Sequence, residues 1–277
     1  MTGAHTNSLG AGGLTIDDLN RTAACPRCGA SLAIELGLDG RCEKCEARYP
    51  ALPYGWDLTP PRELWSSEMW TTWQGVQENG RVGYEEDPER NIAVGQREDA
   101  TAFARFCGLA GLVLDVGCGP QEWPSYFRDY APGTRFVGVD PLVGERPAGY
   151  TQLRALAEHL PFRSGVFDQV LFATTLDHFV DPRAAIAEAA RVLAPGGTID
   201  AWIGHKRPGA PSPSVSPEWY RSLVRPPGAD DLFHIKRLDA SQTADLLDES
   251  GLRVIAREDL PVDEFRSNHF FKAVAER

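Results

Sequence analysis

The chain has 277 residues, a length that predicts one large domain or two unequal ones. Its 39 acidic and 28 basic residues give a net charge of −11, which disfavours unaided binding to phosphate backbones unless a local basic patch exists. Apolar residues make up 42% and charged residues 24%, which excludes a disordered or collagen-like chain. There is no apolar run of membrane-spanning length, and the Gly- and Ala-rich start lacks the features of a signal peptide, so we expect a cytoplasmic location.

Four of the six cysteines lie within 21 residues and form two C-x-x-C pairs, Cys25 with Cys28 and Cys42 with Cys45. Each pair can aim two thiolates at one point, and two pairs complete a tetrahedral site that suits zinc. Four thiolates leave no open coordination position, so we expect a structural ion. Two disulfides are the alternative, which a reducing cytoplasm disfavours.

This cysteine segment resembles a small zinc ribbon. The similarity rests on Cys-Pro-x-Cys-Gly at residues 25–29, the second C-x-x-C, and Tyr49-Pro50 after it. Similar ribbons occur in activator subunits of tRNA methyltransferases and ahead of many bacterial methyltransferase domains. We therefore expect a flexible N-terminus over residues 1–20 and a zinc ribbon over residues 21–60 whose folding depends on metal. A protein partner or a second copy of the chain is a possible ligand of the ribbon.

Residues 61–108 are expected to form a helical connector or lid. Trp65, Trp70 and Trp73 lie on its predicted helix, and the last two share one face. Packing between the ribbon and the following domain is one interpretation. The other is an aromatic lid over a planar or apolar acceptor.

Strand-like and helix-like patterns alternate from Gly111 onward, which predicts a doubly wound α/β sheet. The apolar strand 112–116 runs into Gly117-Cys118-Gly119, where the backbone can approach a ligand closely and a helix N-terminus is expected to follow. A second strand, 135–139, ends on Asp140, 21 positions after Gly119. A doubly wound fold places a carboxylate there against ribose hydroxyls.

Residues 113–120 and Asp140 resemble the first motif and the ribose-binding acid of class I S-adenosylmethionine-dependent methyltransferases of the methyltransferase-11 type. Residues 157–162, 167–178 and 191–199 are similar to later segments of that family in the same order. The resemblance implies a Rossmann-like seven-stranded methyltransferase domain over residues 109–277 with an antiparallel last strand. It also implies S-adenosylmethionine as cofactor, bound by Asp115, Gly117, Cys118, Gly119, Asp140, Pro141, Ala157, Glu158 and Thr174.

A dinucleotide-dependent dehydrogenase is the competing interpretation, but Glu122 stands where G-x-G-x-x-G needs its last glycine. The chain also departs from the methyltransferase pattern, because Gln121 replaces a usual third loop glycine and Leu156 a usual adenine-binding Asp. The link 141–150 is short and contains two prolines, so its helix is expected to be lost or reduced to one turn.

The remaining elements follow from local signals. Asp181 and Pro182 predict the start of a helix over residues 182–194, and a second helix is expected over residues 238–249. Strands are expected at residues 198–203, 252–256 and 269–275.

Two histidines follow predicted strands at the edge where open α/β sheets bind ligands. His178 and His205 are therefore candidate catalytic residues, as bases or acceptor contacts, and His234 is a weaker candidate. Hydrogen bonding to loop backbone is the alternative for each. Asp177 is expected either to bind substrate or to cap a helix. Cys107 and Cys118 are expected to be packed apolar residues.

The segment 205–232 contains six prolines and is too long for a plain connector, so we expect a cover in which Trp219 and Tyr220 form an apolar wall.

Methyl transfer to a small sugar, nucleotide-linked or secondary-metabolite acceptor is the expected function, since the charge of −11 disfavours nucleic acid. An RNA methyltransferase that docks through its ribbon is the alternative, although the ribbon lacks the interleaved aromatic and basic residues that single-stranded RNA needs. A third hypothesis is a non-catalytic cofactor sensor.

Overall fold

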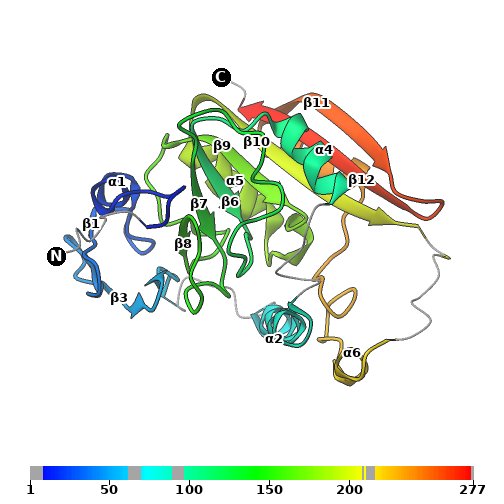
Figure 1. The fold of residues 1–277 in the computed structure, drawn as a ribbon, viewed down its shortest axis with the longest axis horizontal. Helices are drawn as coiled ribbons and strands as arrows, with labels where there is room; N and C mark the ends of the chain where they lie inside the picture. Colours follow the sequence, from blue (N-terminus) through cyan, green and yellow to red (C-terminus); the bar gives the residue numbers. More distant parts are fainter. Residues whose placement is uncertain (1–8, 62–69, 89–96, 208, 210–215, 276–277) are drawn as a thin grey trace, which may run out of the picture.

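A seven-stranded mixed sheet forms the centre of the computed structural model, which describes residues 9–61, 70–88, 97–207, 209 and 216–275 (Figure 1). The strand order is β11-β12-β10-β9-β6-β7-β8; the strands from β6 to β10 run parallel, and β12 is antiparallel to both of its neighbours. The expected sheet and its antiparallel last strand are therefore confirmed. The strands are β6 (Leu112–Val116), β7 (Arg135–Val139), β8 (Thr151–Leu153), β9 (Phe167–Ala173), β10 (Leu193–Lys206), β11 (Leu252–Pro261) and β12 (Arg266–Ala275).

Helices cover both faces of the sheet. One face packs against α1, α5 and α7 in a single buried cluster, and the other packs against α4. The start signal of one helix acts as the sequence predicts, because the Asp181 carboxylate accepts two N–H groups of α5. Asp239, which the sequence analysis did not single out, forms a capping box on α7. These helices are α1 (Ile16–Thr22), α4 (Glu98–Cys107), α5 (Pro182–Val192) and α7 (Ala240–Glu249).

The connections between β6, β7, β8 and β9 contain no helix anywhere in residues 117–166, all of which the structure describes. The prediction of a helix directly after the glycine loop is therefore wrong. Pro120 and Pro124 remove backbone donors from that segment, and aromatic side chains pack it down instead: the Phe127 ring stacks on Phe136 at 4.1 Å. The short link 141–150 lacks a helix, as its prolines predict.

The N-terminal segment and the cysteine-bearing lobe pack on this half of the sheet, at the left in Figure 1. Leu14 and Leu19 are fully buried in the same core as Val137 and Leu153, so residues 9–20 are ordered where a flexible tail was expected. Burial of these leucines supplies the stabilisation that ordering the segment requires.

The cysteine-bearing lobe is built from very short strands, and its last part covers the open edge of β8. The Leu58 N–H donates to the Arg154 carbonyl at 2.8 Å, and the Arg154 N–H donates to the Trp56 carbonyl at 3.0 Å. Pairing of this kind removes an exposed strand edge. The strands are β1 (Leu32–Ala33), β2 (Gly40–Cys42), β3 (Arg48–Tyr49), β4 (Ala51–Leu52) and β5 (Gly55–Trp56).

A further helix, α2 (Trp70–Glu86), lies across the carboxyl edge of the sheet and is tied to the segment that contains α6 (Glu218–Ser222). The Asn79 amide donates to the carbonyls of Val224 and Leu232 at 3.0 and 2.8 Å. Trp65, expected on the same helix, lies outside the described residues. Within the described part of the chain, no helix has the length and apolar character needed to cross a membrane.

Candidate functional site

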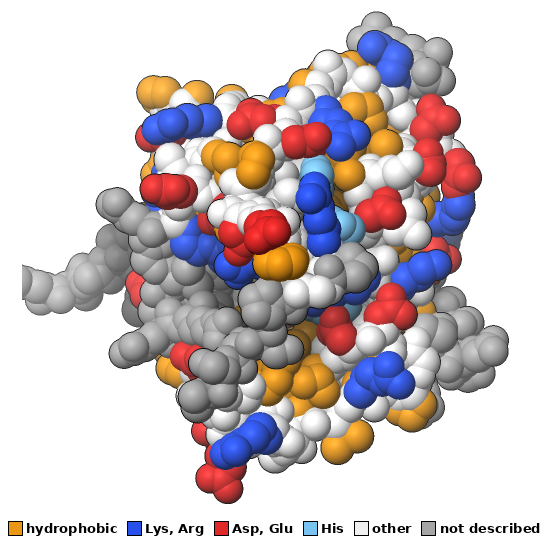
Figure 2. All heavy atoms as spheres, turned by 90° about the vertical axis from the view of Figure 1, so that its right-hand side faces the viewer, with side chains coloured by type: hydrophobic (Ala, Val, Ile, Leu, Met, Phe, Trp, Pro, Cys, Tyr) orange, Lys and Arg blue, Asp and Glu red, His pale blue; other side chains and the backbone are white. Residues whose placement is uncertain are grey.

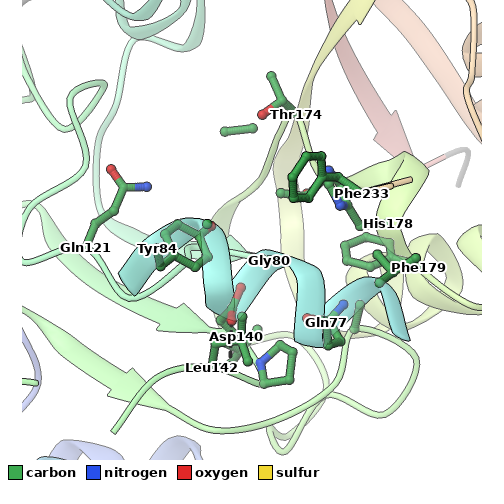
Figure 3. A pocket seen from close by; sticks show the side chains of 18 of the residues that line it. Gln77, Gly80, Tyr84, Gln121, Asp140, Leu142, Thr174, His178, Phe179 and Phe233 are labelled. Carbon is green, nitrogen blue, oxygen red and sulfur yellow. Dashed lines mark hydrogen bonds between the residues drawn. The ribbon is translucent and has the colours of Figure 1, made fainter. Parts of the chain in front are cut away.

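A cavity of about 420 Å³ opens at the carboxyl ends of β6, β7 and β9, beneath α2 (Figure 3). This is the edge at which open α/β sheets bind ligands. The strand ends contribute Gly117, Asp140 and Thr174. The helix contributes one face, whose residues recur at helical spacing: Trp73, Val76, Gln77, Gly80, Gly83 and Tyr84.

The glycine loop and Asp140 form the floor of the cavity. The Asp140 carboxylate accepts the Gly119 N–H at 3.0 Å and the Leu142 N–H at 2.8 Å. Burial raises the pKa of Asp140 to about 6, against the opposing effect of these two donors. Gly117 has φ of +82°, and a Cβ there would lie 2.6 Å from the Thr175 side chain, so only glycine fits.

Three of the nine residues that the resemblance implies for the cofactor do not line the cavity with their side chains. Asp115 is fully buried behind the loop, where its Oδ2 accepts the Tyr126 hydroxyl at 2.7 Å and its Oδ1 has no hydrogen bond. Burial raises the pKa of Asp115 to about 7. Cys118 packs into the core against Gly138, as expected of an apolar residue, and Gly119 contributes the N–H that fixes Asp140.

The other six implied residues do line the cavity: Gly117, Asp140, Pro141, Ala157, Glu158 and Thr174. The Glu158 carboxylate accepts the N–H groups of Val180 and Asp181 at 2.9 and 3.1 Å, which fixes the loop after β8 to the start of α5. Thr174 has a φ of +62°, an unfavourable conformation for a β-branched residue. Such strain tends to persist where the surrounding structure enforces it, as at ligand sites.

Arg97 is the one arginine or lysine among the described residues that line the cavity, and the sequence analysis missed it. Its Nε donates to Asp99 at 2.8 Å, and its guanidinium lies 5.5 Å from the centre of the Trp202 ring. Both contacts hold the guanidinium in place at the cavity wall. No motif surrounds Arg97 in the sequence, so only the fold reveals it.

Aromatic side chains form a further part of the cavity wall. Trp73 lines the cavity and stacks on Trp70 with ring centres 4.6 Å apart. Trp219 and Tyr220 line it from α6, so this part of the expected apolar cover is present. The helix bearing the tryptophans therefore lies over the cavity, and not between the ribbon and the sheet.

The three candidate histidines have different positions. His178 lines the cavity, and its pKa is lowered to about 4, chiefly because burial disfavours the charged ring. His234 lies behind it, with ring centres 4.5 Å apart. His205 is not in the cavity lining, because β10 continues to Lys206 alongside β12 and carries it to His269, 6.2 Å away between ring centres. The structure thus does not place His205 where the sequence analysis expected it.

The four N-terminal cysteines converge, with their sulfur atoms within 4.8 Å of one another. Cys25 and Cys45 are 3.7 Å apart and Cys28 and Cys42 are 3.5 Å apart, too far for a disulfide bond. The Cys42 sulfur accepts the N–H groups of Lys44 and Cys45, each at 3.4 Å. Zn–S bonds of about 2.3 Å place tetrahedral sulfurs about 3.8 Å apart, so the cluster fits zinc.

Comparison with known proteins agrees with this geometry. Residues 114–199 match the family model described as a methyltransferase domain. The chain is 29% identical over 187 residues to the O-methyltransferase cnsE of Penicillium expansum, covering 60% of this chain and 66% of that one. It is 35% identical over 104 residues to an uncharacterized methyltransferase of Mycolicibacterium gilvum, covering 33% and 40%.

A similar solved structure is the 1,6-didemethyltoxoflavin-N1-methyltransferase of Burkholderia thailandensis with bound 1,6-didemethyltoxoflavin and S-adenosylhomocysteine. It has a TM-score of 0.53 at 12% identity, with 88% of this chain and 99% of that chain covered. This likeness shows the α/β methyltransferase fold. The chain spans less than two thirds of the length of the curated relatives named above. Together these findings show that the sheet carries a methyltransferase domain.

Proposed function

We propose that the protein uses its S-adenosylmethionine-dependent methyltransferase domain to transfer a methyl group to a small, planar or apolar acceptor. The observation that carries this proposal is a cavity that the start of the glycine loop, the Asp140 carboxylate and several aromatic rings line together. A volume of about 420 Å³ is within the range of small-molecule sites.

Each part of the cofactor has complementary residues in this cavity. Asp140 would accept the ribose hydroxyls, and the backbone at Gly117 would contact the methionine portion. Backbone groups near Ala157 and Glu158 would hold the adenine. Arg97 would bind the methionine carboxylate, since no helix N-terminus follows the glycine loop to do so.

The acceptor would lie between the aromatic wall and His178. A bound sulfonium supplies an activated methyl group, so the protein's main task is to position the acceptor in line with it. Trp73, Trp219 and Phe233 offer ring faces that suit a flat acceptor. His178 is uncharged near neutral pH, so its ring can accept a proton or share a lone pair at the acceptor end.

The surface favours a small acceptor over RNA. On the face drawn in Figure 2, the described lysine and arginine side chains are interspersed with aspartates and glutamates and form no continuous basic surface. The cavity is also covered by α2 and the segment 217–233. A nucleotide within an RNA chain would need a basic approach to such a site.

We also propose that the cysteine cluster holds a structural zinc ion. Four thiolates would complete a tetrahedral shell, so the ion would hold the two halves of the ribbon together without taking part in methyl transfer. Metal analysis of the purified chain should find one zinc per chain bound by these cysteines, and four reactive thiols should appear when it is removed. Absence of zinc together with four missing thiols would indicate disulfides.

Methyl transfer from labelled S-adenosylmethionine tests the main proposal. Calorimetric binding should be detected for the wild type and lost in Asp140→Ala, with a panel of phenolic, sugar and RNA acceptors then assayed. Labelled phenolic product supports the proposal. Binding without transfer to any small acceptor, or transfer to RNA alone with steep salt dependence, would contradict it.

A further inference from the structure

Three side chains converge beside the acceptor end of the cavity. Asp177 and His178 come from the short 3₁₀ turn η2 (Leu176–His178) after β9, and His234 comes from the segment after α6. Their ligand atoms lie within 4.8 Å of one another. The Nε2 atom of His178 is 3.6 Å from one Asp177 oxygen, and Nε2 of His234 is 3.7 Å from the other.

These separations are too long for hydrogen bonds but close to those of atoms that share a metal ion. A metal about 2.1 Å from each ligand atom places the atoms about 3.0–3.4 Å apart. The two distances between histidine and aspartate would therefore need to shorten by only a few tenths of an ångström, and all three ligand atoms already lie within 4.8 Å of one another.

The Asp177 carboxylate lies among basic side chains. The residue is 6% exposed, and the imidazoles of His178 and His234 lie on either side of its carboxylate. The nearest permanent cation is Arg237, whose Nη1 is 3.9 Å away and whose Nε instead donates to Asp231 at 2.8 Å. Burying a carboxylate costs free energy, which nearby positive charge offsets, and a bound cation would add such charge.

Asp231 orients the second imidazole for this purpose. The Nδ1 of His234 is 2.7 Å from Oδ1 of Asp231, which also accepts the N–H groups of Phe233 and His234. A proton on Nδ1 leaves the Nε2 lone pair directed at Asp177. A carboxylate behind a metal-binding histidine is a frequent arrangement in metal sites. Neutral imidazole is the metal-binding form of histidine.

We propose that Asp177, His178 and His234 bind a divalent transition-metal ion whose open coordination positions face the acceptor. Two histidines and one carboxylate favour zinc, iron or a similar ion over magnesium and leave positions for further ligands. His178 and Phe233 both line the cavity, so an acceptor oxygen is the ligand that fits there. This assignment of the acceptor rests on the proposed methyl transfer, whereas metal binding does not.

The ion would activate an acceptor hydroxyl. Coordination lowers the pKa of the hydroxyl, its proton passes to water, and the O–H electron pair stays on oxygen. That oxygen then forms the bond to the methyl carbon while the C–S electron pair remains on sulfur, giving the methyl ether and S-adenosylhomocysteine. His178 then serves as a ligand in place of a free base.

Titration of the full chain with Co²⁺, without S-adenosylmethionine and with the ribbon already loaded with zinc, tests the site. The wild type should bind one equivalent of Co²⁺ without thiolate charge-transfer absorption, which shows that cobalt is away from the cysteines. Asp177→Asn and His234→Gln should each weaken this binding at least tenfold, and the matched control His205→Gln should not.

Thermal melting and S-adenosylmethionine binding establish that each variant is folded. The proposal is overturned in favour of a metal-free cluster if the wild type binds no Co²⁺ beyond the zinc-loaded ribbon. It is also overturned if Asp177→Asn and His234→Gln bind Co²⁺ as tightly as the wild type does. If the wild type binds Co²⁺ but does not bind S-adenosylmethionine, only the proposed methyl transfer is contradicted, and thermal melting alone then shows that the variants are folded.

Discussion

The carboxylate of Asp140 accepts the backbone N–H of Gly119 at 3.0 Å, which joins the end of β7 to the loop after β6. One acidic side chain thus both shapes the glycine loop and faces the cavity. The pKa of about 6 means that this carboxylate is ionised at neutral pH but loses its charge on mild acidification. Its role can therefore be tested by pH.

Cofactor affinity should depend on the ionisation of Asp140. The ionised carboxylate accepts ribose hydroxyls and the protonated one does so poorly, so affinity should be full above pH 7 and should fall by up to about tenfold per pH unit below 6. Calorimetry from pH 5 to 8 measures this. Asp140→Asn should bind weakly with little pH dependence over that range. Asp129→Asn, a change outside the cavity, should retain the dependence of cofactor affinity on pH that the wild type shows. A wild-type affinity that does not change with pH would contradict the role of Asp140 in binding the ribose.

Arg97 should contribute to binding through its charge. If it pairs with the methionine carboxylate, Arg97→Met should weaken S-adenosylmethionine binding about 10- to 100-fold, as expected for a charge-assisted hydrogen bond. Arg105→Met changes an exposed arginine on α4, the helix that begins directly after Arg97, and should have little effect. Adenosine lacks the carboxylate, so its affinity should be nearly the same in both variants. An equal loss for adenosine would indicate a structural role for Arg97.

The sequence predicts the sheet well because its signals are local. Apolar runs end on glycine or Asp140, and the caps at Asp181 and Asp239 act within one turn of their helices. The missing helix after the glycine loop was not anticipated, because burial of Trp123 and Phe127 depends on contacts with distant strands. Local patterns carry little information about such packing.

Much of the candidate site was hidden for the same reason. His234 and Asp177 are 57 positions apart, and nothing in their spacing predicts that they meet. The ribbon was expected to fold as a separate zinc-dependent unit, yet Cys25 and Cys42 share a buried cluster with β6 and β7. The resemblance to methyltransferases predicts the cofactor side of the cavity, whereas the proposed acceptor side comes from α2 and residues 217–237, which lie outside the similar motifs.

Backbone strain at Thr174 should be measurable. Its φ of +62° is accessible to glycine without steric cost, whereas alanine keeps most of the strain. Thr174→Gly should therefore be more stable than Thr174→Ala by about 1 kcal/mol. Chemical denaturation of the two variants gives the difference directly, since both lack the threonine side chain. A less stable glycine variant would show that the backbone is not strained there.

The buried carboxyl of Asp115 should make stability depend on pH. The pKa of Asp115 is about 7 in the folded protein and exceeds the ordinary value of 3.8. The contribution of this carboxyl to stability is therefore full below pH 3.8 and is lost as the pH rises through 7. Between pH 6 and 8 the free energy of unfolding should fall by about 1 kcal/mol more in the wild type than in Asp115→Asn. Asparagine retains an acceptor for the Tyr126 hydroxyl, so the comparison isolates the charge. Urea denaturation at the two pH values measures it, and parallel changes in both proteins would show that Asp115 does not titrate in this range.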